Sequence, residues 1–173
     1  PYAGDDWDWG LDVGLQHLLT ADINSRYTGN FLVVLMTRSK PLQAVLMGLS
    51  YLAIPWLMAS LASDRSREPK VFFLCFLAAN GLILSMDPQI WRQTWGWIAG
   101  FANYGFSILG LLLCLFPAMR LFRETPGPCR SSVLRDLGLF LLSFLNQLFL
   151  ENLTLYMVLY TGALCAIGLF RER

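Results

Sequence analysis

Hydrophobic residues gather in long runs along the chain, and this pattern predicts a helical membrane protein. Five runs contain no charged side chain: residues 41–62, 71–86, 97–118, 137–150 and 153–170. A helix needs about 20 apolar residues to cross a bilayer, so the first and third runs are long enough, and the second is a thin span at best. We therefore expect an all-α, polytopic bundle of about five membrane segments.

The course of the predicted helices is uncertain from the sequence at two places in the chain. Pro55 interrupts the first run, which membrane helices tolerate when neighbouring groups satisfy the freed carbonyl. Only Glu151 and Asn152 separate the fourth run from the fifth. Residues 137–170 are therefore either two spans, two half-depth helices or one long bent helix.

The first 40 residues are more polar and form a region distinct from the bundle at 41–173. A helix is predicted over residues 11–19. The apolar run 31–36 is too short to cross a bilayer, so we expect an amphipathic helix lying in the membrane interface. The chain begins at Pro1 without a basic or apolar leader, and we expect it to be a fragment that a first membrane helix once preceded.

Composition and charge place the chain in lipid. It is 55% hydrophobic and 14% charged, whereas soluble domains carry about a quarter charged residues. The net charge of +1 gives no reason to expect a nucleic-acid partner. Basic side chains fall in alternate loops, at Arg65, Arg67, Lys70, Arg120, Arg123, Arg130, Arg135, Arg171 and Arg173. The positive-inside rule makes those loops cytoplasmic and the acidic N-terminal segment extracytoplasmic.

Residues 4–10 are a candidate for chemistry because Asp5, Asp6 and Asp8 are interleaved with two tryptophans. Crowded carboxylates at a membrane surface suit a general base or the binding of a divalent cation. A solvated acidic loop with interfacial tryptophans explains the same residues equally well. The spacing does not decide between these interpretations, and whether a metal binds stays open.

Three polar side chains elsewhere, Arg26, Asn103 and Glu151, are candidate ligand contacts. Arg26 either pairs with the acidic loop or binds an anionic ligand. Asn103 lies in an apolar run and needs a hydrogen-bond partner there. A partner on a neighbouring helix explains this asparagine better than contact with a substrate does. Glu151 is an ionisable group between two apolar runs, a costly position that marks functional sites. His17, the sole histidine, is interpreted as a surface or packing residue.

Four motifs together resemble a known layout. In order they read Gly-Asp-Asp-Trp-x-Trp-Gly, Asn-x-Arg-Tyr-x-Gly-Asn, Trp-x-x-Gly-Phe-Ala-Asn-Tyr and Gln-Leu-Phe-x-Glu-Asn-x-Thr, and they span positions 4 to 154. They resemble an uncharacterised family of bacterial polytopic membrane proteins that is similar to the GT-C glycosyltransferases, which use polyprenyl-phosphate-linked sugars. Ser25 stands where that family often has Gly, and family members are longer at both ends.

The resemblance implies a site at the outer face of the cell membrane. It implies that Asp5 or Asp6 acts as the base on an acceptor hydroxyl, with a divalent cation as an optional helper. It suggests Arg26 and Arg92 as contacts to the lipid phosphate, and Asn103, Tyr104 and Glu151 complete the candidate substrate contacts. The expected function is sugar transfer from a polyprenyl-phosphate carrier during cell-surface polysaccharide assembly. The alternative is a non-enzymatic transport or assembly subunit for lipid-linked glycans.

Overall fold

The computed structural model describes residues 6–20, 24–63, 68–123, 133–150 and 154–163. Those residues are almost entirely helical, which confirms the all-α fold class. Within them, two helices are long and apolar enough to cross a membrane, or three if a bent pair counts as one span. The expectation of five membrane segments is therefore met only in part.

The first long helix, α4 (Lys40–Ala62), corresponds to the first predicted span. It begins at Ser39, whose side chain accepts the Leu42 N–H, and Pro41 occupies the first turn, where a missing N–H costs nothing. The helix continues through Pro55, as the sequence predicts, and Pro55 itself is buried. Only 22% of its most apolar window is buried inside the protein, as expected for a helix that faces lipid.

The second apolar run forms α5 (Pro69–Leu84), which is followed by the short helix α6 (Pro88–Thr94). Asp87 begins α6 by accepting the N–H of Gln89 at 2.8 Å. The two helix axes meet at 98°, so α6 lies across the end of α5 and does not extend it. The sequence signal Asp87-Pro88 therefore marks a sharp corner in the chain.

The third apolar run forms one continuous helix that is long and apolar enough to span a membrane over Ile98–Phe116, and it is made of three helical pieces. It consists of α7 (Ile98–Gly100), a π-helical turn η1 (Phe101–Gly105) and α8 (Phe106–Arg123). Within η1 the N–H of Phe106 bonds the carbonyl of Phe101, five residues back. Such π turns are rare and often lie at functional sites.

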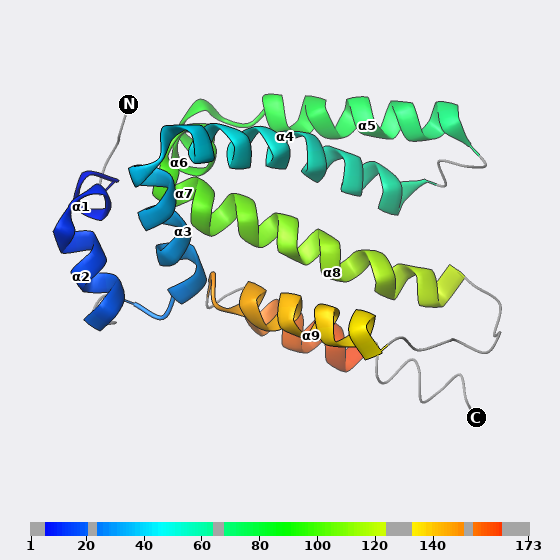
Figure 1. Cartoon of the computed structure of the whole chain (residues 1–173). Coiled ribbons are helices and arrows are strands. Elements are labelled where there is room, and N and C mark those ends of the chain that lie inside the picture. Colours follow the sequence, from blue (N-terminus) through cyan, green and yellow to red (C-terminus); the bar gives the residue numbers. More distant parts are fainter. Residues whose placement is uncertain (1–5, 21–23, 64–67, 124–132, 151–153, 164–173) are drawn as a thin grey trace.

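The fourth run forms α9 (Val133–Gln147), whose apolar part is shorter than a full span. The helix ends at Gln147, and a second helical segment covers 154–163. Thr154 joins the two, because its hydroxyl donates to the carbonyl of Gln147 at 2.9 Å. Figure 1 shows the chain reversing direction there, so 137–163 is not one long helix.

Three short helices cover one end of this bundle: α1 (Asp6–Gly10), α2 (Asp12–Thr20) and α3 (Tyr27–Arg38). α2 and α3 agree with the predicted helices at 11–19 and 31–36, whereas Asp6–Gly10, interpreted from the sequence as part of an acidic loop, is the helix α1. In Figure 1, α3 runs across the long helices at the left, with α1 and α2 outside it. Its buried side chains include Val33, Val34 and Met36, which join the hydrophobic core.

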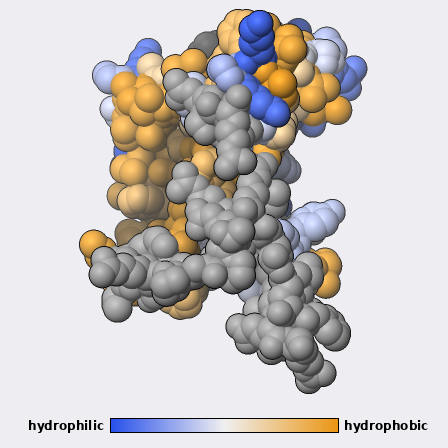
Figure 2. Space-filling model, turned by 90° about the vertical axis from the view of Figure 1, so that its right-hand side faces the viewer, coloured by the Kyte–Doolittle hydropathy of each residue, from blue (hydrophilic) through white to orange (hydrophobic). Residues whose placement is uncertain are grey.

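The long helices alternate in direction, so their ends fall into two groups (Figure 1). One group lies beside α1, α2 and α3, and the other contains the end of α4, the start of α5, the end of α8 and the start of α9. Large hydrophobic side chains remain exposed along the helices, among them Leu52, Leu74, Leu82 and Phe140. In Figure 2, which faces the right-hand end of Figure 1, hydrophobic surface covers much of the described residues, which is compatible with a lipid environment.

Candidate functional site

The polar segments that the sequence singled out meet at the end of the bundle covered by α1, α2 and α3. Asp6 of the first segment bonds the start of the third apolar run. Thr28 of the second segment bonds the end of α9, with its N–H donating to Leu148 at 3.2 Å and its hydroxyl donating to the Leu145 carbonyl at 3.0 Å. The four motifs are thus assembled in space although they lie far apart in the sequence.

Asp6 caps the start of α7, the first piece of the long helix that continues through η1 and α8. Its carboxylate is fully buried and accepts the N–H groups of Ala99 at 2.9 Å and Ile98 at 3.3 Å. These N–H groups belong to the first turn of that helix, where no carbonyl is available to them. The negative charge also opposes the positive end of the helix dipole. That this carboxylate takes a proton from an acceptor stays a prediction, whereas its capping role is observed directly.

Arg38 fixes α1 and α2 onto α3. Its guanidinium donates to the carbonyl of Trp9 at 2.8 Å and to that of Leu11 at 2.7 Å. The Trp9 carbonyl lies in the last turn of α1, and the Leu11 carbonyl, between α1 and α2, also accepts the N–H of Gly14 at 3.1 Å. The structure thus gives Arg38 a positioning role.

Asn103 projects from the π-helical turn toward α3. Its side-chain N–H donates to the carbonyl of Ala99 at 2.8 Å, and the residue is buried. A Cβ placed on Gly29 would overlap the Asn103 oxygen, so the absence of a side chain at Gly29 lets the two segments approach. Asn146 and Gly110 repeat this arrangement between α9 and α8.

Asn146 anchors α9 to the same span. With its amide nitrogen donating to the Ser107 carbonyl and its oxygen accepting the Leu111 N–H, both at 3.2 Å, its hydrogen bonds are satisfied. Polar contacts of this kind hold helices together in an apolar environment. The polar side chains at this end therefore serve partly as structural links.

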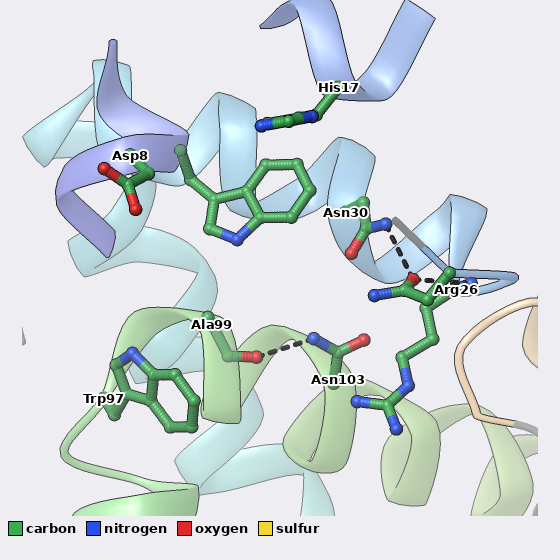
Figure 3. A pocket seen from close by; sticks show the side chains of 9 residues that line it. Asp8, His17, Arg26, Asn30, Trp97, Ala99 and Asn103 are labelled. Carbon is green, nitrogen blue, oxygen red and sulfur yellow. Dashed lines mark hydrogen bonds between the residues drawn. The ribbon is translucent and has the colours of Figure 1, made fainter. Parts of the chain in front are cut away.

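A cavity of about 150 Å³ lies among these segments. Figure 3 shows its lining from α1, α2, α3 and the start of the long span. Charged, amide and aromatic side chains share its wall: Asp8, Trp9, His17, Asn24, Arg26, Asn30, Trp97 and Asn103, with Ala99. This combination suits a small, polar ligand with an apolar face.

The N-terminal end of α3 holds Arg26 at the cavity through two amides. The side-chain oxygen of Asn24 accepts the backbone N–H of Arg26 at 3.0 Å and the side-chain N–H of Asn30 at 2.9 Å (Figure 3). An asparagine that bonds the backbone two residues ahead forms a local turn. The turn fixes the backbone from which the half-buried Arg26 side chain reaches the cavity.

The candidate contacts named from the sequence divide into three groups. Arg26 and Asn103 line the cavity. Arg92 is exposed on α6, and Tyr104 is 39% exposed; neither lines the cavity. Asp5 and Glu151 lie outside the described residues. Within the described part of the chain, no three His, Cys, Asp or Glu side chains lie close enough together to hold a metal ion.

Sequence reasoning missed several lining residues. His17 was interpreted as a surface or packing residue, and it lines the cavity from α2. Asp8 was one of three equivalent aspartates, and it is exposed and lines the cavity while Asp6 is buried. Asn24, two residues before Arg26, carried a usable signal, because an asparagine at that spacing favours a local turn.

Comparison of the chain with protein-family models, curated proteins and solved structures finds no match. The function is therefore inferred from the site.

Proposed function

We propose that the protein is a membrane glycosyltransferase-like enzyme whose cavity receives the phosphate-sugar head of a polyprenyl-phosphate carrier. The observation that carries this proposal is a small polar cavity at one end of an apolar helical bundle, lined by both Arg26 and Asp8. A lipid-linked substrate needs this combination, since its tail requires an apolar surface while its head requires polar contacts.

Arg26 supplies the contact to the phosphate in this proposal. A guanidinium is always charged and binds phosphate oxygens through paired N–H groups. Its backbone is fixed by Asn24, which keeps it at the cavity. As the sugar leaves its carrier, negative charge grows on the phosphate, and a fixed arginine stabilises that charge.

Asp8 is the carboxylate that a ligand in the cavity would meet, and we assign it the role of base. It takes the proton from an acceptor hydroxyl while the hydroxyl oxygen attacks the anomeric carbon of the sugar. The bond between that carbon and the phosphate oxygen breaks, and the polyprenyl phosphate leaves with the electron pair. Asp6 stabilises the helix beneath the site through its cap.

The proposed setting is the outer surface of a bacterial cell membrane. The acidic residues of α1 and α2 then face outward, while the basic loops at the opposite group of helix ends face the cytoplasm. The enzyme would thereby act on glycans assembled outside the cytoplasm.

Asp8→Asn in the full-length protein tests the catalytic part. The substitution keeps the shape and removes the base, so transfer of labelled sugar from an isoprenyl-phosphate hexose should fall about 10²- to 10⁴-fold. Asp12→Asn, an exposed carboxylate in the first turn of α2, is the matched control and should retain activity.

Asp6 also supports a second candidate, a non-enzymatic binding or assembly subunit for lipid-linked glycans. One of the two aspartates named as catalytic is buried in a cap, which leaves fewer carboxylates for chemistry. If the full-length protein binds the lipid but transfers no sugar, and Asp8→Asn leaves that binding intact, this second candidate replaces the enzyme.

A further inference from the structure

We propose that α3 lies in the membrane interface with Tyr27, Phe31 and Leu35 inserted among the lipids, and that this holds Arg26 at the depth of the lipid phosphates. The part that concerns Arg26 rests on the proposed function, because it states how a lipid-linked phosphate reaches that side chain. The three inserted residues are side chains that α3 turns away from the rest of the protein.

The polarity of α3 is the reverse of that of a helix that faces water. Four of its positions are exposed: Tyr27, Phe31, Leu35 and Arg38. The first three are between 37% and 51% exposed. Asn30 and Thr37, in contrast, are buried and hydrogen-bonded, with Asn30 donating to Asn24 at 2.9 Å and Thr37 donating to the Val33 carbonyl at 2.8 Å. A helix in water turns its polar side chains outward, so the outer side of α3 suits an apolar medium.

The three apolar side chains form one row along the helix. Residues four positions apart lie one above the other on a helix, so Tyr27, Phe31 and Leu35 stand in line. The row differs from the apolar run 31–36 of the sequence, because three members of that run are buried in the core and the row continues to Tyr27. A tyrosine, which has an apolar ring and a polar tip, is a typical residue of the membrane interface.

The direction of α3 fits the surface of a bilayer. In Figure 1, α3 runs across the long helices, so it lies parallel to the membrane that α4 and the Ile98–Phe116 helix are able to cross. Its buried positions are covered by its contacts with α1, α2, α4, α7 and η1. The exposed row therefore faces the surroundings of the bundle at the level where the long helices end.

The chain leads directly from this row to a helix that faces lipid. Ser39 is the only residue between α3 and α4, and α4 exposes Val45 and Leu49 at 55% and 60%. A membrane that surrounds α4 therefore meets α3 at its surface. Lys40, exposed at the corner between the two helices, suits the phosphates of lipid headgroups. We therefore assign the lipid bilayer, and not a second protein, as the partner of the row.

Insertion of α3 sets the depth of the cavity. Arg26 directly precedes Tyr27, the first residue of α3, and lines the cavity. An interfacial helix lies at the boundary between headgroups and acyl chains, so a side chain at its end stands near the phosphates. A carrier phosphate then reaches Arg26 by moving within the plane of the membrane. Its polyprenyl tail stays in the hydrocarbon, which avoids the free-energy cost of exposing that tail to water.

Spin labels on the full-length protein test the insertion in nanodiscs of phosphatidylethanolamine and phosphatidylglycerol. Phe31→Cys and Leu35→Cys carry a nitroxide, with the native cysteines replaced, and collisions with oxygen are compared with collisions with a water-soluble nickel chelate. Oxygen concentrates in hydrocarbon, so both labels should favour oxygen. Leu49→Cys on α4 is the lipid control, and Asp12→Cys, exposed on α2, is the water control.

The collision data have two outcomes that overturn the proposal. Collisions dominated by nickel at Phe31→Cys and Leu35→Cys would place the row in water. Exclusion of both reagents would mean that a second copy of the chain or another protein covers the row. Ser25→Cys, exposed beside Arg26, should meet both reagents, as a position near the phosphates does. A label there as deep as that of Leu49→Cys would contradict the depth assigned to Arg26.

Phe31→Asn connects the insertion to the proposed reaction. Without the inserted ring, α3 should leave the lipid more often, so the KM for an isoprenyl-phosphate hexose should rise about 3- to 10-fold while kcat changes less than about twofold. Gln16→Asn, at an exposed position of α2 that does not line the cavity, is the matched control and should leave KM unchanged. Equal effects of the two substitutions would contradict a role of the row.

The two proposals fail in different ways. If the labels lie in lipid but the protein neither binds nor transfers the lipid-linked sugar, the proposed function is wrong, and the interfacial position of α3 stands without its consequence for Arg26. If the labels lie in water while sugar transfer depends on Asp8 as proposed, the position of α3 is wrong and the function stands.

Discussion

Asn103 occupies the space that a side chain on Gly29 would need, so the π-helical turn and α3 meet at this point without a gap. The contact joins two segments that are over 70 positions apart in the sequence. It also sets the position of the Asn103 amide, because one side bonds Ala99 and the other packs on the Gly29 backbone. The cavity wall therefore depends on a glycine that does not itself line it.

The first prediction is that Gly29→Ala destabilises the protein. The added methyl group must displace Asn103 or α3, and overpacking of this kind costs about 1 to 3 kcal/mol of the free energy of unfolding. A lower midpoint of thermal unfolding in detergent would show it. Gly48→Ala on α4 is the control, since nothing lies within 4 Å of a Cβ there, and its effect should stay within about 1 kcal/mol.

A double variant isolates the contact. Asn103→Ala removes the group that the new methyl would strike, so Gly29→Ala should cost less in that background than in the wild type. Additive losses in the double variant would mean that Gly29 is constrained by something other than Asn103.

The second prediction separates the capping role of Asp6 from the proposed role of Asp8 as base. Asp6→Ala leaves the N–H groups of Ile98 and Ala99 without their acceptor, so it should lower the free energy of unfolding by about 1 to 3 kcal/mol. Asp8→Asn, at an exposed position, should leave stability unchanged. Unfolding of both variants in chemical denaturant provides the measurement. A fully stable Asp6→Ala would contradict the cap.

Much of this fold follows from local sequence. The apolar runs, Pro41 in a first turn and the Asp87-Pro88 pair predict where α4 and α6 begin, because those signals act over a few residues. The partner of Asp6 does not follow, because it lies 92 and 93 positions away and three neighbouring aspartates look alike in the sequence. Only the packing of α1 against the start of α7 shows that Asp6 is a helix cap and not a ligand contact.

The roles of His17 and Arg38 likewise depend on contacts with residues that are distant in the sequence or on another helix. A single histidine without a second metal ligand nearby gave no reason to expect a site, and only the placement of α2 over α3 brings it to the cavity. Arg38 ends α3, a position that favours interaction with carbonyls, and besides the carbonyl of Val34 in its own helix it binds those of Trp9 in α1 and Leu11 just after α1. Long-range contacts thus decide which polar residues are structural.

The third prediction concerns Arg38. Arg38→Gln keeps a polar side chain but cannot span the carbonyls of both Trp9 and Leu11, so α1 and α2 should loosen. Hydrogen bonds to a charged donor contribute about 1.5 to 3 kcal/mol, so amide exchange in α1 and α2 should accelerate about 10-fold or more. Exchange in α4 should be unchanged, which makes α4 an internal control. Uniform acceleration over the whole chain would indicate global destabilisation and contradict a local clamp.

The last prediction tests the membrane orientation on which the proposed site depends. Single cysteines are placed at Gln89, which is exposed on α6, and at Ser66, in the sequence between α4 and α5, with the native cysteines replaced. Because the alternating helices separate these two links, a reagent that cannot cross the membrane should label only one of them in intact cells. The positive-inside rule predicts that Gln89→Cys is labelled from outside and Ser66→Cys only after the cells are opened.

The labelling result discriminates between three cases. The predicted pattern leaves the cavity at the outer surface, where an extracytoplasmic acceptor can reach Asp8. The reverse pattern would move the cavity to the cytoplasmic side and exclude glycan transfer outside the cell. Labelling of both cysteines from outside would mean that α5 does not separate two membrane faces, so α5 and α6 would form a re-entrant pair. That outcome would agree with the 98° bend between them and with the short length of α5, and it would reduce the described spans to two.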